Sequence, residues 1–244
     1  MEQRRMSTGV ALIPARGGSR RIPRKNVRPF LGVPAIARVI ATVIASGVAD
    51  RVLVSTDDEE IAGVARDAGA EVPSLRPTQL ADDHATTAHV IHHAITTWLA
   101  MLDLDSPLLV AYPTALLLTP ETLRAASDRF SASDADFLLP VLRYPHPVER
   151  RLRIDQFGLL LPDEPEHLHT RTQDLEPAYH DAGQFYLGRV SAWLSSSSPL
   201  SAGRSLSFEL GLDEAVDIDD PADWDRAEAL ARLRERSGKS RLEP

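Results

Sequence analysis

An α/β fold, with a mostly parallel sheet covered by helices on both faces, is the class that this sequence predicts. Short apolar runs, such as Val10-Ala11-Leu12-Ile13, alternate along the chain with segments whose apolar residues recur at helical spacing. This alternation is typical of parallel strands joined by crossover helices. The 244 residues suffice for one core, and no internal repeat divides them. We therefore expect a single domain at residues 9–236, between flexible tails at residues 1–8 and 237–244.

The first part of the chain gives the clearest alternation. We expect strands at residues 10–13 and 51–55, around Val72 and at residues 108–111, and helices after Pro34, from Glu59 and from Thr86 or Thr87. Boundary residues support this order, because Asp57 or Asp58 can cap the second helix, and Gly47 and Gly69 can end the first two. A long loop at residues 15–26 separates the first strand from the first helix.

The alternation breaks between residues 143 and 179, after a helix that begins at Thr119 and a strand at residues 137–142. Inside that stretch, residues 151–154 and 159–161 flank Gln156-Phe157-Gly158, a pattern typical of a hairpin. We interpret the stretch as an excursion from the main sheet, either a lid or a dimer contact. Strands are expected again at residues 184–187, 206–210 and 215–218, and Pro221 opens a last helix.

The composition excludes several classes of protein. With 27 basic and 35 acidic residues the formal net charge is −8, so we expect no general binding to nucleic acid or to anionic membranes. Cysteine is absent, which removes disulfides, thiolate catalysis and sulfur-ligated metals. No apolar run approaches the length of a membrane span, and the N-terminal one is too short for a signal peptide. A cytoplasmic protein is the default expectation.

The loop after the first strand carries the strongest local signal for a ligand. It contains Ala15, Gly17, Gly18 and Ser19 among the cations Arg16, Arg20, Arg21, Arg24, Lys25 and Arg28. Glycines let backbone N–H groups approach an anion, and clustered cations neutralise it. Lys25 stands out because the only other lysine is Lys239, and a compact ammonium suits a transferring phosphate. The loop predicts a polyphosphate site; the alternatives are a solvated basic loop or a nucleic-acid patch.

A pair of carboxylates near the end of the chain predicts a metal site. In Val216-Asp217-Ile218-Asp219-Asp220-Pro221, strand alternation would send Asp217 and Asp219 to one face, just before the last helix. Hard oxygen ligands suit Mg²⁺, which fills its other positions with water and substrate phosphate. The alternative is a simple helix cap, for which Asp220 is the better candidate. A cationic loop and a carboxylate pair together indicate phosphoryl or nucleotidyl transfer.

Several motifs occur together along the chain. They are Ala15-Arg16-Gly17-Gly18-Ser19, Ile22-Pro23-Arg24-Lys25-Asn26, Val54-Ser55-Thr56-Asp57-Asp58-Glu59-Glu60-Ile61-Ala62, Leu75-Arg76-Pro77, Leu80-Ala81-Asp82-Asp83 and Asp217-Ile218-Asp219. In this combination the chain resembles the acylneuraminate (CMP-sialic acid synthetase) cytidylyltransferase family over about residues 10–233. Tyr112-Pro113-Thr114-Ala115 and the segment from Thr170 to Tyr186 resemble the pseudaminic acid branch most closely.

The resemblance implies a three-layer fold of the nucleotide-diphospho-sugar transferase type. It implies a homodimer, in which the excursion reaches the active site of the neighbouring copy, and Mg²⁺ as the cofactor. The implied reaction joins CTP to the anomeric hydroxyl of a nine-carbon nonulosonic acid, most closely pseudaminic acid, and releases pyrophosphate.

Carried over residue by residue, the resemblance implies a role for each part of the site. Arg16 and Lys25 would hold the triphosphate within the loop formed by Ala15, Gly17, Gly18 and Ser19, and Asn26, Arg76, Ala85 and Thr87 would line the cytidine site. Asp217 and Asp219 would hold Mg²⁺, and one of them would orient or deprotonate the attacking hydroxyl; with Arg16 and Lys25 they are the expected catalytic residues. Tyr112, Gln184 and Tyr186 would lie near the sugar, and Arg171 would meet its carboxylate.

Two positions depart from the pattern of the branch, and both are expected on the sugar side. Leu116 stands in place of a proline, and Leu187 stands in place of a tryptophan. N-acetylneuraminic or legionaminic acid is therefore the alternative substrate, and a catalytically inactive nucleotide-binding or nucleic-acid-binding protein is the alternative of another class. The sequence leaves two interpretations of His180-Asp181 open: an acid–base couple, or a structural hydrogen bond.

Overall fold

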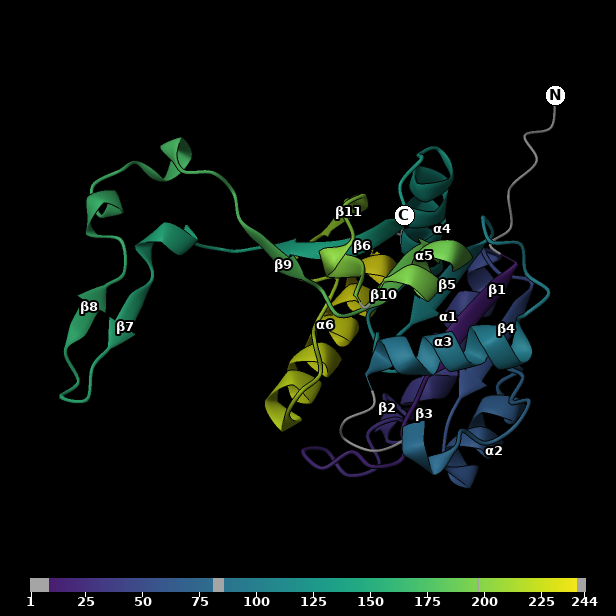
Figure 1. Cartoon of the computed structure of the whole chain (residues 1–244). Coiled ribbons are helices and arrows are strands. Elements are labelled where there is room, and N and C mark those ends of the chain that lie inside the picture. Colours follow the sequence, from purple (N-terminus) through teal and green to yellow (C-terminus); the bar gives the residue numbers. More distant parts are fainter. Residues whose placement is uncertain (1–8, 81–85, 197, 241–244) are drawn as a thin grey trace.

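The computed structural model describes residues 9–80, 86–196 and 198–240, and these residues form a seven-stranded sheet (Figure 1). The strands lie in the order β11-β6-β10-β5-β1-β4, and β9 pairs with β6 beside this row. Their bounds are β1 (Val10–Pro14), β4 (Arg51–Ser55), β5 (Pro107–Ala111), β6 (Phe137–Arg143), β9 (Tyr179–Asp181), β10 (Phe185–Arg189) and β11 (Ser205–Leu210). β1 runs parallel to β4 and β5, and β11 parallel to β6, whereas β9 and β10 are antiparallel to their neighbours. The expected mostly parallel sheet is confirmed.

Helices cover both faces of the sheet because residues of each inner strand alternate between two cores. Ala11 and Ile13 of β1 belong to the core shared with α1 (Ala35–Ser46), α2 (Glu59–Asp67) and α4 (Pro120–Ser131). Val10 and Leu12 belong to the core shared with α3 (Thr87–Trp98) and α5 (Val190–Ser195). A strand buried on both faces is what an uninterrupted apolar run predicts. The three-layer architecture is confirmed.

A third apolar cluster fixes the C-terminal helix α6 (Pro221–Ser240) against the cationic loop. Trp224 of α6 packs edge-on against Phe30, with 5.7 Å between the ring centroids, and Ile22 of the loop is fully buried in the same cluster. Asp220 caps the helix, since its carboxylate accepts the N–H groups of Ala222 and Asp223. The helix continues to Ser240, past residue 236, where we expected the domain to end.

Three other helices begin at residues whose side chains cap them. Asp58 accepts the N–H of Ile61, Thr86 accepts that of His89, and Thr119 accepts that of Thr122. The structure thus decides between the paired candidates Asp57 and Asp58, and Thr86 and Thr87. Gly47 ends α1 in the left-handed conformation, with a φ of 65°.

Two expected strands are absent. Around Val72 the chain makes only a single bridge, between Leu53 and Glu71. Residues 215–218 also form no strand, and two of their carbonyl groups are bonded by side chains instead of by a neighbouring strand. Gln184 Nε2 donates to Val216 O at 3.2 Å, and Lys25 Nζ donates to Ile218 O at 2.7 Å. Burial still alternates there, with Val216 and Ile218 buried and Asp217 and Asp219 exposed, so the two carboxylates do share a side.

The excursion projects from the body and carries the expected hairpin (Figure 1). β7 (Leu152–Ile154) and β8 (Leu160–Pro162) pair with each other in a separate sheet. Asp155 closes the turn, because its carboxylate accepts the N–H groups of Phe157 and Leu159, and Gly158 adopts a φ of 83°. The remaining small elements are the pair β2 (Pro29–Phe30) and β3 (Val33–Pro34) and the 3₁₀ turns Thr78–Leu80, Val148–Arg150, Pro165–His167, Thr172–Asp174 and Pro199–Ser201.

Candidate active site

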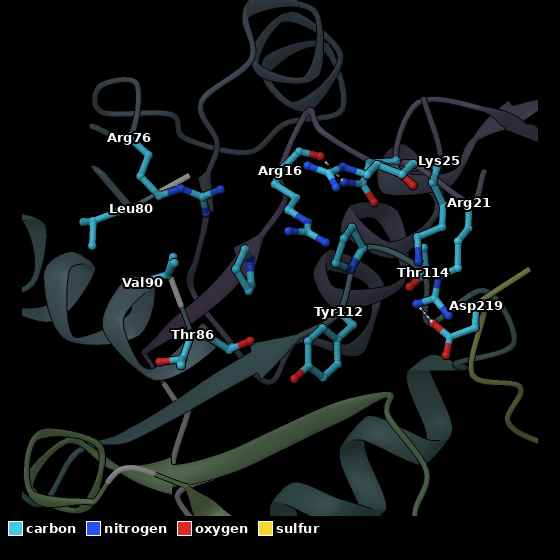
Figure 2. Close-up of a pocket in the computed structure, with 16 residues that line it drawn as sticks. Arg16, Arg21, Lys25, Arg76, Leu80, Thr86, Val90, Tyr112, Thr114 and Asp219 are labelled. Atoms are coloured by element: carbon cyan, nitrogen blue, oxygen red, sulfur yellow. Dashed lines mark hydrogen bonds and ion pairs between the residues drawn. The ribbon is translucent and has the colours of Figure 1, made fainter. Parts of the chain in front are cut away.

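A cavity of about 600 Å³ lies beyond the carboxyl ends of β1 and β5, where ligands bind in open α/β sheets (Figure 2). The sequence-predicted residues that line it are Arg16, Ser19, Lys25, Asn26, Arg76, Thr87, Tyr112 and Asp219. Arg76 and Val90 lie at one end of the cavity, Lys25 and Asp219 at the other, and Arg16 between them (Figure 2). One concave site therefore joins the cationic loop to Asp219, whereas Asp217 of the carboxylate pair does not line the cavity.

The backbone of the cationic loop is held on both sides of Arg16. Ala15 N–H donates to Ser55 O at 2.9 Å, and Asn26 Nδ2 donates to Arg16 O at 2.9 Å. Gly17 N–H then donates to a carboxylate oxygen of Asp57 at 3.2 Å. These contacts fix the Arg16 backbone, and its side chain extends into the cavity (Figure 2).

The two loop glycines differ in what surrounds them. A Cβ at Gly17 would lie 2.7 Å from Oδ2 of Asp58, so the close approach of these two residues requires glycine. A Cβ at Gly18 would meet nothing within 4 Å, so packing does not explain that glycine. Ser19 follows with its N–H bonded to Gly17 O at 3.0 Å and lines the cavity.

Arg76 forms the buried wall at the other end. Its backbone N–H donates to Thr56 O at 2.7 Å, its Nη1 to Ser55 O at 3.2 Å and its Nη2 to Asp57 Oδ1 at 3.2 Å. Only 3% of the side chain is exposed, and its Nε is buried without a hydrogen-bond partner. Burial lowers the pKa of the Arg76 guanidinium, an effect that Asp57 opposes.

Lys25 links the loop to the carboxylate pair. Its Nζ donates to Ile218 O at 2.7 Å, between Asp217 and Asp219, and Arg21 Nη2 bonds Asp219 Oδ1 at 2.6 Å. Burial lowers the pKa of the Lys25 ammonium; Asp219 and Asp217 oppose that change, while Arg21 and Arg16 add to it. A cation held in this way interacts strongly with an arriving anion.

The carboxylate pair suits a divalent cation. Burial, and next the charge of Asp219, raise the pKa of the Asp217 carboxyl. A cation between two mutually repelling carboxylates would remove that repulsion. Within the described part of the chain no three His, Asp or Glu side chains gather for a metal, so Asp217 and Asp219 offer two ligands only. Mg²⁺ fits such a donor set, because it takes one or two carboxylates together with substrate phosphates.

The residues expected near the sugar occupy different depths. Tyr112 lines the cavity, and its ring lies edge-on to Tyr186, with centroids 5.7 Å apart. Tyr186 lines a smaller adjoining cavity of about 190 Å³ and donates its hydroxyl hydrogen bond to Asp181. Gln184 is only 1% exposed and holds Val216 O, so it supports the segment that carries Asp217.

Leu116 and Leu187, which we expected on the sugar side, line neither of these two cavities. Leu187 is buried in the core under α1, because strand alternation turns it away from Tyr186. Leu116 packs in the α6 cluster. Arg171 lies on the excursion and does not line the cavity, and Ala85 falls outside the described residues.

Three residues make contacts in the site that the sequence did not assign to them. Arg21 pairs with Asp219, Asp57 contacts both Gly17 and Arg76, and Asp181 pairs with Tyr186. Arg21 stood in the cationic loop, and Asp57 and Asp181 stood inside recognised motifs, but only the tertiary contacts show which charged groups meet. His180 and Asp181 form no side-chain couple, because His180 Nδ1 contacts the Asp181 backbone carbonyl.

Several known proteins are similar in sequence to this one over most of the chain. Residues 10–149 match the family described as cytidylyltransferase. The pseudaminic acid cytidylyltransferase of Campylobacter jejuni subsp. jejuni is 36% identical, over 93% of this chain and 98% of the relative. The CMP-N,N'-diacetyllegionaminic acid synthase of Legionella pneumophila is 33% identical over 92% and 96%. The N-acylneuraminate cytidylyltransferase A of Danio rerio is 31% identical over 93% of this chain and 51% of the relative.

Among solved structures, CMP:2-keto-3-deoxy-manno-octonic acid synthetase complexed with CTP superposes with a TM-score of 0.67. The two chains are 17% identical, and the match covers 93% of this chain and 99% of the other. Within the described ranges no helix is both long and apolar enough to cross a membrane. The fold is that of the nucleotide-diphospho-sugar transferases. The chain belongs to the cytidylyltransferase family.

Proposed function

We propose that the protein joins the cytidylyl group of CTP to pseudaminic acid and releases pyrophosphate. The observation that carries this proposal is the single cavity that holds Arg76 at one end and Arg16, Lys25 and Asp219 toward the other. The choice of sugar rests on two pseudaminic acid cytidylyltransferases that are 36% and 35% identical over 93% of this chain. Legionaminic acid is the second candidate, because the Legionella relative is 33% identical over a similar span.

In the proposed reaction the anomeric hydroxyl oxygen of the sugar attacks the α-phosphorus of CTP. The new bond joins that oxygen to phosphorus, the bond from the α-phosphorus to the bridging oxygen breaks, and that oxygen leaves with pyrophosphate. Lys25 and Arg16 offset the growing negative charge of the leaving group. The hydroxyl proton is lost to Asp219, which lines this end of the cavity, or to Asp217, two residues before it. Positioning and charge neutralisation supply most of the catalysis.

Mg²⁺ is part of the proposal, with Asp217 and Asp219 as its protein ligands. When bound, this ion neutralises phosphate charge and fixes the orientation of the triphosphate. Arg21 pairs with Asp219, and both side chains are more than half exposed, so this ion pair is weak enough for Asp219 to exchange it for a metal ion.

A homodimer completes the proposal. The excursion presents apolar side chains to solvent, among them Phe157 at 77% exposure and Ile154 at 71%. Contiguous apolar surface of this kind is typical of an interface. In the dimer the excursion of one copy brings its Arg171 to the sugar carboxylate in the other. We also propose a cytoplasmic location, since CTP is made and used there.

The test is pyrophosphate release from purified protein with CTP and Mg²⁺, in parallel with pseudaminic, legionaminic and N-acetylneuraminic acids. We expect the highest kcat/KM with pseudaminic acid. A higher kcat/KM with another sugar would identify that sugar as the substrate, and the proposed reaction would stand. No pyrophosphate release with any of the three sugars would contradict both the substrate and the reaction.

Thermal melting tests the non-enzymatic alternative. CTP with Mg²⁺ should raise the Tm, and duplex DNA at moderate salt should not.

A further inference from the structure

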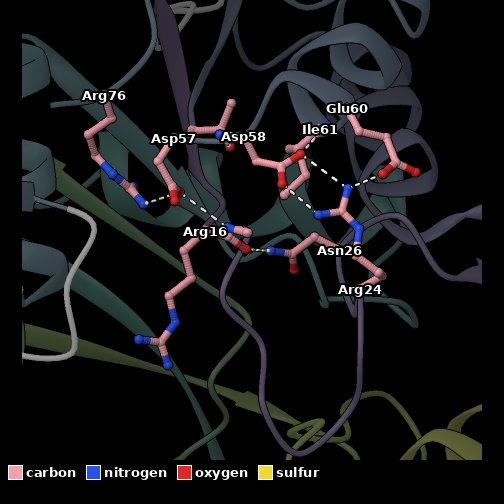
Figure 3. Close-up of polar contacts among 10 residues, drawn as sticks. Arg16, Arg24, Asn26, Asp57, Asp58, Glu60, Ile61 and Arg76 are labelled. Carbon is pink, nitrogen blue, oxygen red and sulfur yellow. Dashed lines mark hydrogen bonds and ion pairs between the residues drawn. The ribbon is translucent and has the colours of Figure 1, made fainter. Parts of the chain in front are cut away.

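We propose that Asp57 is a positioning residue. It couples Arg76, at the end of the cavity where the base of CTP would bind, to the cationic loop, which would hold the triphosphate. One oxygen of its carboxylate accepts hydrogen bonds from Gly17 N–H and from Arg76 Nη2, each at 3.2 Å (Figure 3). The two donors lie in different segments, one after β1 and the other 21 residues beyond β4. This inference rests on the proposed function, in which Arg76 lines the cytidine site and the loop holds the triphosphate.

On the loop side, Asp57 controls the direction of Arg16. The Arg16 carbonyl is held by Asn26, and the next N–H, that of Gly17, is held by Asp57. The Arg16 side chain points away from these contacts (Figure 3) and lines the cavity. Loss of the Asp57 contact would free one of the two anchors, so the guanidinium would no longer be aimed before the anion arrives.

On the base side, Asp57 neutralises a buried charge. The Arg76 side chain is only 3% exposed. Its Nη1 donates a hydrogen bond to Ser55 O, which carries no formal charge. Asp57, at 23% exposure, is the carboxylate that contacts it. A buried guanidinium without a counter-charge is costly, so removal of Asp57 would displace or loosen Arg76. A single acidic side chain thus sets the position of two cations that meet different parts of one nucleotide.

The neighbouring Asp58 has a separate task, which keeps Asp57 in place. It caps α2 through Ile61 N–H and binds Arg24 at 2.5 and 3.1 Å. It also lies against Gly17, so the loop cannot move toward α2. Asp57 therefore stands on a rigid support, and its carboxylate is available to the two donors of the site. The consequence is that a ligand without any base should still depend on Asp57.

Tripolyphosphate is the probe for that consequence, because it carries the charge of CTP and lacks the base. We would measure its Kd and that of CTP by calorimetry, and the KM values of CTP and sugar in the pyrophosphate assay. The variants are Asp57→Ala, which removes both hydrogen bonds, and Asp57→Asn, which keeps an acceptor oxygen and removes the charge. Glu59→Ala, two residues away and exposed, is the matched control.

We expect Asp57→Ala to raise the Kd of tripolyphosphate and that of CTP about tenfold each, which is the effect of losing hydrogen bonds to a charged group. The sugar KM at saturating CTP should stay unchanged, which a general loss of structure would not give. Asp57→Asn should bind tripolyphosphate within about threefold of the parent, because Gly17 keeps its acceptor, and bind CTP about fivefold more weakly, because Arg76 loses its counter-charge.

Unchanged tripolyphosphate affinity in a folded Asp57→Ala protein would overturn the coupling. If circular dichroism shows that the alanine variant does not fold, the nearly isosteric Asp57→Asn variant is the test. A CTP affinity of Asp57→Asn equal to that of the parent would then overturn the coupling. A tenfold weakening in Glu59→Ala would also count against it, since the loss would then not depend on the two hydrogen bonds that Asp57 accepts. Failure of the parent protein itself to bind CTP would contradict the proposed function instead.

Discussion

The Lys25 ammonium group donates a hydrogen bond to the carbonyl oxygen of Ile218 at 2.7 Å, although the two residues are 193 positions apart. Because Ile218 stands between Asp217 and Asp219, this contact brings the cationic loop close to the carboxylate pair, and Asp219 lines the same end of the cavity as Lys25. Both carboxylates interact with the Lys25 charge. In the proposed function, a triphosphate would therefore meet Lys25 and a metal ion on the carboxylates at the same time.

Substitution of Lys25 should affect turnover more than substitution of Arg21. Lys25 is half-buried beside the carboxylate pair, whereas the Arg21 side chain is 67% exposed. We expect Lys25→Ala to lower kcat/KM by about 10²- to 10³-fold, and Arg21→Ala by about tenfold or less. Pyrophosphate release measures both, with circular dichroism to verify folding. An equal loss in the two variants would remove the special role of Lys25.

The CTP affinity should depend on pH through Lys25. Burial lowers the pKa of its ammonium, and only the protonated form neutralises a triphosphate. Affinity should therefore fall as the pH rises through that lowered pKa, which lies below the ordinary lysine value of about 10.5. Calorimetric Kd values from about pH 7 to about pH 10 test this. Lys25→Arg should shift the fall to higher pH, and an unshifted profile would assign it to another group.

Asp217→Asn should stabilise the metal-free protein and abolish its response to Mg²⁺. The folded-state pKa of Asp217 is raised, so the folded chain binds this proton more tightly than the unfolded chain. The ionised carboxylate therefore costs stability above the raised pKa, and the cost vanishes below about pH 4, where both states are protonated.

Asp217 is exposed, so solvent screens much of this cost, and we expect a Tm gain of roughly 1–2 °C at pH 7 that disappears toward acid. Differential scanning fluorimetry with and without Mg²⁺ measures both effects. Asp225→Asn, on the exposed side of α6, is the control and should change neither. A lower Tm for Asp217→Asn would contradict the sign of this prediction.

Tyr186→Phe should destabilise the part of the site around Asp181. The Tyr186 hydroxyl donates to Asp181, whose other oxygen accepts Gly183 N–H at 2.9 Å. Gly183 in turn lies against Asp217, since a Cβ there would be 3.3 Å from its carboxyl carbon. We expect a loss of about 1–3 kcal/mol in urea unfolding, as for a buried hydrogen bond to a charged group. Tyr144→Phe, at an exposed tyrosine, should lose much less.

Charge on the excursion should disrupt the proposed dimer. Phe157→Glu combined with Ile154→Glu places carboxylates on exposed apolar residues of the hairpin. We expect the mass from light scattering to fall from dimer to monomer, and activity to fall with it. Leu104→Glu, which alters a residue 59% exposed on the body, is the control and should stay dimeric. A monomeric parent with full activity would contradict the dimer.

Local signals predicted most of the elements correctly, because short-range physics sets them. Asp58, Thr86 and Thr119 cap their helices through atoms within three residues, and the Gly158 turn is equally local. The strand expected at residues 215–218 was wrong for the opposite reason. Two of its carbonyls are bonded by Gln184 and Lys25, which are distant in sequence.

The sequence by itself determined the α/β class, the cationic loop and the acidic pair, because alternating apolar runs, glycines and charges carry that information at each position. Only the tertiary structure decided which charges meet: Arg21 with Asp219, Asp57 with both Gly17 and Arg76, and Tyr186 with Asp181. It also turned Leu187 into the core, away from Tyr186. Hydrogen bonds and ion pairs depend on distances of a few ångströms between remote segments, and the packing of the whole sheet sets those distances.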